Sequence, residues 1–266
     1  MSDDSWSAIA ADWVPLWGSF AGPVWHAVLS AVPGPADRTA SFRMLDVGCG
    51  GGEFLRYARG VLSAPPRDAS TRPVDALARE HAERERPVAV VGIDPAPGML
   101  TAARTNADSV VQADVLHLPW RDAAFDLVTA VNSLQFAEDT DDALAEMIRV
   151  TAPDGRIAVA NWADRALNDL DALERALAGG AGQPDGDLRV AGGLAELLVD
   201  GGLTVVASGL VEVPWEVPDA ATLVRGILLG EDPALAPEVV AAADPYRLES
   251  GGYRLINHFR FAVGSL

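Results

Sequence analysis

Lysine is absent from this 266-residue sequence, and its 20 basic side chains are all arginine. A lysine amine is needed for Schiff-base catalysis, for the P-loop that binds a nucleoside triphosphate, and for the Tyr-Lys pair of short-chain dehydrogenases. The sequence therefore excludes pyridoxal enzymes, lysine-dependent aldolases, P-loop kinases and short-chain dehydrogenases.

Cysteine, histidine and positive charge are also scarce. Cys49 is the single cysteine, which excludes an intramolecular disulfide and a cysteine-rich metal site. No two histidines have metal-ligand spacing, so we expect no metal; the four are His26, His81, His117 and His258. The net charge of −18, without a basic stretch, repels polyanions, and we therefore expect no nucleic acid partner.

No uncharged run is suited to a membrane helix. The longest, residues 13–36, is interrupted by Pro15, Pro23, Pro33 and Pro35, and the first residues lack the basic segment of a signal peptide. The hydrophobic fraction of 49% is that of a globular protein with a sizeable core. We expect a soluble cytoplasmic protein, a monomer or a homodimer, that acts without a membrane partner.

From residue 43 onward, short β-branched runs alternate with helical patterns, which is typical of a parallel sheet covered by helices. The helices are predicted at residues 141–150, 166–179 and 192–200. The strands are predicted at residues 43–47, 88–93, 109–113, 125–131, 156–161, 203–213 and 253–262. One or two short helical segments separate the last two strands, which could pair as an antiparallel edge unit.

Two segments interrupt this alternation. Residues 63–87 are rich in Pro, Arg and Ala, and we interpret them as a solvated surface insertion. Residues 1–40 contain four of the seven tryptophans. We expect these tryptophans to pack against the core, to cover a substrate as part of a helical lid, or to do both. We divide the chain into this lid, an α/β core over residues 41–213, a small cap insertion over residues 214–252 and a final strand over residues 253–266.

A glycine-rich turn follows the first predicted strand. Asp46 ends the strand, and Gly48, Gly50 and Gly52 come directly before a helix. Glycines in such a turn permit positive φ and let a ligand approach the backbone. The dinucleotide fingerprint needs a third glycine where this chain has Glu53, whose charge opposes a pyrophosphate. A ligand with a neutral or cationic group therefore suits the turn better.

Five ordered elements over roughly residues 40–165 resemble the class I S-adenosylmethionine-dependent methyltransferases, in particular the type 11 and type 25 small-molecule enzymes. Asp46 and the glycines match the first motif, and residues 90–94 match the second strand, which ends in an acid. The other elements match residues 95–100, 111–115, 125–136 and 149–156. The resemblance implies an α/β, Rossmann-like fold with a seven-stranded, mostly parallel sheet, an antiparallel last strand and helices on both faces.

The resemblance implies S-adenosylmethionine as cofactor and S-adenosylhomocysteine as its product. In that family the acid corresponding to Asp94 binds both ribose hydroxyls, Met99 packs on the adenine, and Asp114 accepts from the adenine amino group. We interpret Cys49 as a space-filling residue in the turn. The implied cofactor-binding residues are Asp46, Gly48, Cys49, Gly50, Asp94, Pro95, Met99, Asp114, Val115, Asn132 and Gln135.

We predict methyl transfer to O, N or C of a small or medium organic molecule in specialised metabolism. The candidate bases are His26, His258 and Tyr253, although a histidine is more often a surface or packing residue. Residues 132–136 differ from the Asn-Pro-Pro-Tyr loop, which argues against nucleobase and glutamine-amide methylation. The candidate substrate contacts are Trp17, Phe20, Phe136, Trp162 and Arg225, with Phe136 and Met99 alternatively in the core.

Three other functions are weighed against methyl transfer. The same fold can use the sulfonium for cyclisation or as an electrostatic catalyst without moving the methyl group. A non-catalytic module that binds S-adenosylmethionine or a partner is the second alternative. A nicotinamide oxidoreductase is the weakest, because Glu53 opposes a pyrophosphate and lysine is absent.

Overall fold

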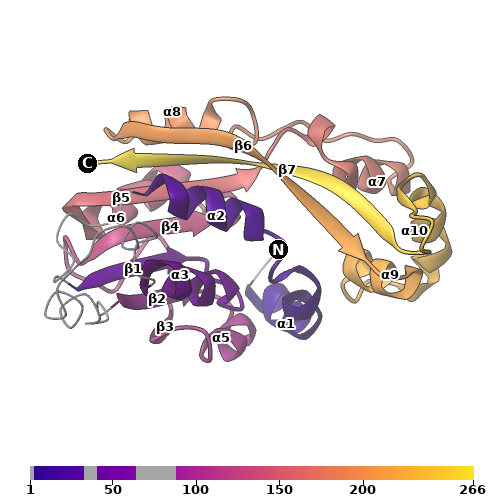
Figure 1. Cartoon of the computed structure of the whole chain (residues 1–266), viewed down its shortest axis with the longest axis horizontal. Coiled ribbons are helices and arrows are strands. Elements are labelled where there is room, and N and C mark those ends of the chain that lie inside the picture. The colour runs from indigo at the N-terminus through magenta and orange to yellow at the C-terminus, as the bar shows by residue number, and fades with distance from the viewer. Residues whose placement is uncertain (1–2, 33–40, 64–87) are drawn as a thin grey trace, which may run out of the picture.

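The computed structural model describes residues 3–32, 41–63 and 88–266. In this part of the chain seven strands form one sheet in the order β3-β2-β1-β4-β5-β7-β6, and only β7 runs antiparallel to its neighbours. The predicted fold class is therefore confirmed (Figure 1). The strands are β1 (Phe42–Val47), β2 (Val88–Asp94), β3 (Ser109–Gln112), β4 (Phe125–Val131), β5 (Thr151–Trp162), β6 (Thr204–Val217) and β7 (Tyr253–Ser265).

Helices cover both faces of this sheet, and short 3-10 turns join some of them. The predicted helices at residues 141–150, 166–179 and 192–200 correspond to α6, α7 and α8. The α-helices are α1 (Asp3–Trp17), α2 (Gly22–Ala31), α3 (Glu53–Ser63), α5 (Pro97–Ala103), α6 (Thr140–Val150), α7 (Asp169–Leu177), α8 (Gly193–Asp200), α9 (Ala220–Leu228) and α10 (Ala236–Ala242). The 3-10 turns are η2 (Leu134–Phe136), η3 (Arg165–Leu167), η4 (Pro233–Leu235) and η5 (Asp244–Tyr246).

Side-chain caps explain where several helices begin. The Asp139 carboxylate accepts hydrogen bonds from the backbone N–H groups of Asp141 and Asp142 at the start of α6. Asp219 accepts in the same way from Thr222 at the start of α9. These bonds satisfy N–H groups that have no partner within the helix.

Two apolar clusters fill the space between the sheet and its helices. Val28 of α2 and Leu55 of α3 belong to the cluster on one face, which includes Met44 of β1. Met147 of α6 and Leu198 of α8 belong to the cluster on the opposite face. Figure 1 shows α2 and α3 in front of the sheet and α6 behind it. This three-layer arrangement is that of a doubly wound α/β domain.

Strands β6 and β7 extend beyond the rest of the sheet. Strand β5 ends at Trp162, which pairs with Phe259, whereas β6 and β7 stay paired as far as Val217 and Tyr253. The strand expected to end at residue 213 is therefore longer, because β7 supplies a partner along the whole extension. Figure 1 shows α7, α9 and α10 gathered around the far end of this two-stranded ribbon.

Helix α1 connects the ribbon to the opposite end of the sheet. Near its start, the Ser7 hydroxyl accepts a hydrogen bond from the backbone N–H of Gly98, at 3.2 Å. At its end, the Trp17 indole N–H donates to the Gly226 carbonyl at 3.0 Å, and the Trp17 ring stacks on Trp215 with centroids 4.2 Å apart. The helix therefore packs on both α5 and α9.

Some sequence expectations concern residues outside the described ranges. They are the insertion at residues 63–87 except for Ser63, His81 within it, and residues 1–2 and 33–40 of the expected lid. Within the described ranges, no helix is long and apolar enough to cross a membrane.

Gly92 in β2 illustrates how closely the glycine turn packs on the sheet. A Cβ atom at this position would lie 2.6 Å from the Cys49 sulfur and 2.7 Å from Leu55 Cδ1. We expect Gly92→Ala to lower the free energy of unfolding by about 1–3 kcal/mol, because both neighbours must move in a packed core. Urea or thermal unfolding measures this change.

Gly60→Ala is the matched control. Gly60 lies in α3, and beyond its own helix no atom of the described residues comes within 4 Å of the Cβ position. Alanine there should stabilise the helix by roughly 0.5–1 kcal/mol. Equal stability of the two variants would contradict the packing described for Gly92.

Candidate functional site

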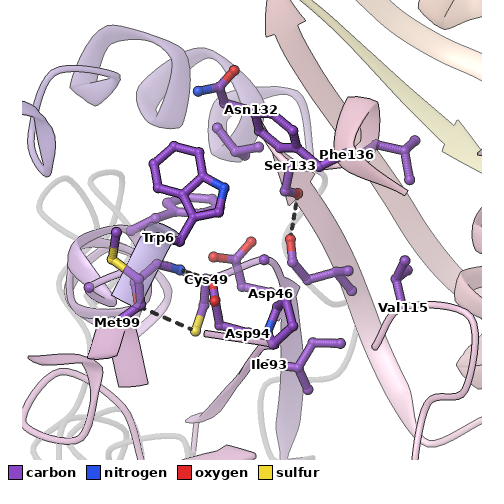
Figure 2. A pocket seen from close by; sticks show the side chains of 18 of the residues that line it. Trp6, Asp46, Cys49, Ile93, Asp94, Met99, Val115, Asn132, Ser133 and Phe136 are labelled. Atoms are coloured by element: carbon purple, nitrogen blue, oxygen red, sulfur yellow. Dashed lines mark hydrogen bonds between the residues drawn. The ribbon is translucent and has the colours of Figure 1, made fainter. Parts of the chain in front are cut away.

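A cavity of about 350 Å³ lies at the carboxyl edge of the parallel strands. The strand register brings these ends together: Asp46 pairs with Gly92, and Val131 pairs with Ala160. Figure 2 shows the side chains of Asp46 and Asp94 in the middle of the cavity, between Met99 and Val115. Ligands of open α/β sheets bind at this edge.

The glycine turn brings backbone to the cavity wall. Gly48, Gly50 and Gly52 have φ values of +70°, +53° and +81°, which side chains rarely permit. A Cβ on Gly48 would lie 2.3 Å from the Cβ of Ser133, whereas a Cβ on Gly50 would have no described residue other than its chain neighbours within 4 Å. The first glycine therefore allows the loop after β4 to approach, and the second leaves open space beside the backbone.

Backbone hydrogen bonds orient the Asp94 carboxylate. One oxygen accepts from the Gly50 N–H and the other from the Ala96 N–H, each at 2.9 Å. Each oxygen keeps a further lone pair, which suits a carboxylate that binds two adjacent hydroxyls. Burial raises the pKa of Asp94, and the bonds from Ala96 and Gly50 oppose that rise.

Asp46 is the most deeply buried acid of the site, with 3% of its surface exposed. The Thr129 hydroxyl donates to one carboxylate oxygen at 2.6 Å. Burial raises the pKa of Asp46 to about 7, and the charge of nearby Asp94 adds to the rise, while the Thr129 bond opposes it. A cation bound beside Asp46 would favour its ionised form.

The charges along the cavity wall have one sign. Burial raises the pKa of Glu53, and Arg56 opposes that rise but does not line the cavity. Among the described residues that line the cavity, none is an arginine or a histidine. The site therefore favours a ligand with net positive charge and opposes a polyanion such as a pyrophosphate. The acids in the wall are Asp3, Asp46, Glu53, Asp94, Asp114 and Glu138.

One wall of the cavity has the side chains expected for a nucleobase site. Pro95, Met99 and Val115 lie along it, and Met99 is nearly fully buried against Ala10 of α1. Asp114 is exposed, and one of its carboxylate oxygens accepts from the backbone N–H of Leu116 at 2.8 Å. A flat ring between the apolar side chains would lie beside that carboxylate.

Cys49 is placed as a packing residue. Its side chain is buried, and its backbone N–H donates to the Ile93 carbonyl at 2.8 Å, which ties the turn to β2. Burial and the carboxylates of Asp46 and Asp94 raise the pKa of its thiol well above the ordinary value. At neutral pH the thiol is therefore protonated and a poor nucleophile.

Aromatic side chains close the cavity on the side of α1. Trp6 meets Phe136 edge to face with centroids 5.6 Å apart, and it meets Trp13 at 4.9 Å. Trp162 of β5 stacks on Phe20 at 5.4 Å. Four of the five predicted substrate contacts line the cavity: Trp17, Phe20, Phe136 and Trp162.

The structure places the remaining predicted site residues elsewhere. His26 Nδ1 lies 3.4 Å from the Tyr57 hydroxyl, and His258 Nδ1 lies 2.8 Å from the Leu167 carbonyl. Tyr253 is 1% exposed and packs among apolar residues of the ribbon. None of the three lines the cavity, so none is placed to act on a molecule within it.

Arg225 and Gln135 also lie outside this cavity. The Arg225 guanidinium forms an ion pair with Asp12 of α1 at 2.6 Å, which follows from the packing of α1 on α9. Gln135 lines a second cavity, described below, and its amide Nε2 donates to Asn132. Every other predicted cofactor-binding residue lines the first cavity.

Four residues that line the cavity were not predicted as site residues: Trp6, Trp13, Ser133 and Glu138. The tryptophans belong to the aromatic pattern that was interpreted as core or lid. Ser133 and Glu138 follow β4, where the position after a parallel strand is the only signal in the sequence.

Comparisons with known proteins agree with this site. The sequence profile of a family described as "Methyltransferase domain" matches residues 70–159. Malonyl-acyl-carrier-protein O-methyltransferase of Geobacter sulfurreducens is 37% identical over 127 residues, which cover 46% of this chain and 47% of the relative. Demethylmenaquinone methyltransferase of Thermus thermophilus is 37% identical over 120 residues, which cover 41% of this chain and 54% of the relative.

Solved structures share the fold over nearly the whole chain. The crystal structure of a SAM-dependent methyltransferase from Aquifex aeolicus matches with a TM-score of 0.53 at 13% identity, covering 97% of this chain and 98% of that one. The chain spans about half the length of the curated relatives that it matches.

The parallel sheet, the glycine turn after β1 and the acid that ends β2 are features of a Rossmann-like α/β fold. Solved methyltransferase structures share this fold. The profile match and the named relatives show that this chain is similar to the class I S-adenosylmethionine-dependent methyltransferases.

The raised pKa of Asp46 has a consequence for stability. Because the folded-state pKa of about 7 exceeds the ordinary value of 3.8, the folded protein keeps a proton between these pH values that the unfolded chain has lost. The contribution of Asp46 to the free energy of unfolding therefore falls as pH rises from about 4 to about 7, and it stays low above pH 7. We expect Asp46→Asn, which stays neutral, to be more stable than the native protein at pH 8, by up to about 4 kcal/mol.

Chemical unfolding at pH 8 and pH 5 measures this difference, which should be smaller at pH 5. Asp154→Asn, at an exposed position near the start of β5, is the control and should show no such gain. An Asp46→Asn protein that is no more stable than the native one at pH 8 would contradict the assignment.

Proposed function

We propose that the protein binds S-adenosylmethionine in the cavity around Asp46 and Asp94 and transfers its methyl group to a small or medium organic acceptor. The acid-lined wall, in which no described residue is an arginine or a histidine, is the observation that carries the proposal. S-adenosylmethionine has a positively charged sulfur, an ammonium group and one carboxylate, and such a wall stabilises its net positive charge. The open backbone at Gly50 and the two lone pairs on Asp94 also fit this cofactor.

The proposal gives each side of the cavity a role. Asp94 binds the ribose hydroxyls, Met99 and Val115 contact the adenine, and Asp114 accepts from its amino group. Asp46 and Glu53 supply negative charge on the side of the cationic groups. When bound, the cofactor supplies an electrophilic methyl group on a positively charged sulfur.

The rest of the chain positions the acceptor. Helix α1 acts as the lid expected within residues 1–40, while α2 packs on the sheet, and the cap at residues 214–252 closes the acceptor side. A protein can accelerate this transfer mainly by orienting the acceptor and excluding water. Because no described residue lining the cavity is a histidine and the chain has no lysine, an acceptor that is itself a good nucleophile is favoured.

The names of the relatives support a small-molecule acceptor. One is named for malonyl groups on an acyl carrier protein and the other for demethylmenaquinone. Cyclisation or simple binding of the cofactor would need the same cavity, and a labelled-methyl assay separates them from methyl transfer, because only transfer moves the label to an acceptor.

Asp94→Ala tests the cofactor site. We expect the affinity for S-adenosylhomocysteine to fall at least about 100-fold, because two charge-assisted hydrogen bonds to the ribose are lost. Isothermal titration calorimetry measures the change, and NAD titrated into the native protein should not bind in the same concentration range.

Asp108→Ala is the matched control. The Asp108 carboxylate also accepts from a backbone N–H, that of Val90 at 2.8 Å, but it does not line the cavity. This variant should keep the native affinity for S-adenosylhomocysteine even if its stability falls. Native affinity in Asp94→Ala would refute the proposed site.

A further inference from the structure

We infer that a second cavity binds the methyl acceptor, and that the acceptor is a flat apolar molecule whose hydroxyl or amine donates a hydrogen bond to Asn161, with Gln135 as the acceptor for a second N–H or O–H. The inference rests on the proposed function, because it assigns the second cavity to the acceptor of that reaction. It adds the chemical class of the acceptor and the residues that select it.

The second cavity has a volume of about 680 Å³ and lies directly beside the first. The two share one wall, and an acceptor in the second cavity would therefore be adjacent to a cofactor in the first. Five of the six shared residues are aromatic. The shared residues are Trp6, Trp13, Trp17, Asn132, Phe136 and Trp162.

Asn161 is an unsatisfied polar group in the wall of this cavity. It lies near the carboxyl end of β5, with 4% of its surface exposed. Its side-chain oxygen is buried and has no hydrogen-bond partner among the described residues. Such a group costs about 1–3 kcal/mol unless a partner arrives, so a ligand that donates a hydrogen bond would be favoured here.

Gln135 presents a second acceptor of the same kind. Its Nε2 donates to the Asn132 side-chain oxygen at 2.9 Å and to the Asn132 carbonyl at 3.2 Å, which fixes the orientation of the amide. Its Oε1 is buried and lacks a partner in the described part of the chain. The Asn132 N–H donates to the Ala160 carbonyl at 2.8 Å, so the turn with Gln135 lies beside the end of β5.

The charged residues of the cavity disfavour an anionic acceptor. Arg165 and Arg189 line it, but both guanidinium groups bind the Asp171 carboxylate, Arg165 at 2.5 Å. Glu174 and Asp187 line it as well. A carboxylate or phosphate would have to displace Asp171 from the arginines and would meet two further acids.

The remaining wall suits a flat apolar body. Besides the shared aromatic rings, Leu170 of α7 and Ile227 of α9 line the cavity. Side-chain bonds fix α7 in place: the Asn257 oxygen accepts from the Leu170 N–H at 3.1 Å, and Asp169 accepts from the Ile256 N–H at 2.6 Å. The cavity therefore combines rigid apolar walls with two acceptors at one side.

Three probes with the same ring system test this inference: 2-naphthol, which donates a hydrogen bond; 2-methoxynaphthalene, its methyl ether; and 2-naphthoate, an anion. Each is titrated calorimetrically into the whole protein saturated with S-adenosylhomocysteine. We expect 2-naphthol to bind at least about tenfold more tightly than the other two, because only it can donate a hydrogen bond to the unpartnered Asn161 oxygen. Equal affinities, or no binding of any probe, would overturn the inference.

Asn161→Leu separates a binding role from a structural one. Because its oxygen has no partner, replacing it should leave the thermal midpoint unchanged or higher, while the preference for 2-naphthol over its methyl ether falls about tenfold. Asn161→Ala, which cannot overpack the site, should show the same loss of preference. A lower midpoint with an unchanged preference would mean that Asn161 is structural and would overturn the inference.

Asn168→Leu is the matched control, since Asn168 is equally buried but fully bonded. Its amide donates to the Ala163 and Asp164 carbonyls, and its oxygen accepts from the His258 N–H. This variant should lower the midpoint and keep the preference. Failure of S-adenosylhomocysteine to bind the native protein would instead refute the proposed function, so the two failures are distinguishable.

Discussion

The Asp94 carboxylate connects the two segments on which the cofactor-type cavity depends. By accepting from the backbone N–H groups of Gly50 and Ala96, it joins the turn after β1 to the start of α5. The Cys49 N–H bond to the Ile93 carbonyl lies beside it, and Gly92 leaves space for the Cys49 side chain. The carboxylate, the turn and β2 therefore form one preorganised unit, so little ordering remains to be done when a ligand binds.

Burial of like charges is the physical cost of this arrangement. Asp46 and Asp94 lie in one cavity without a compensating cation among its described residues, and burial raises the pKa of both. A cation bound beside Asp46 would recover part of this energy. Selectivity for a positively charged ligand and reduced stability of the empty protein thus have the same origin.

The sequence predicted the fold and the cofactor side of the first cavity because both follow from local patterns. An acid at the end of a strand and a glycine in the turn after it can be recognised from their places in the sequence. Asp46, Asp94 and Gly50 line the cavity, as expected. The positions of the His26 and Tyr253 side chains depend on packing between segments that are distant in the sequence, which no local pattern predicts. Asn161 lies near the end of a strand, as Asp94 does, but nothing in the sequence indicates that its side-chain oxygen lacks a hydrogen-bond partner among the described residues.

Helix α1 contributes Trp6, Trp13 and Trp17 to the walls of both cavities, while Ser7 holds it to the core and Trp17 holds it to the cap. A ligand that shifts this helix in one cavity necessarily reshapes the other. By thermodynamic reciprocity, each ligand would then change the affinity of the other by the same factor. Helix α1 is therefore the element through which ligands in the two cavities would be coupled.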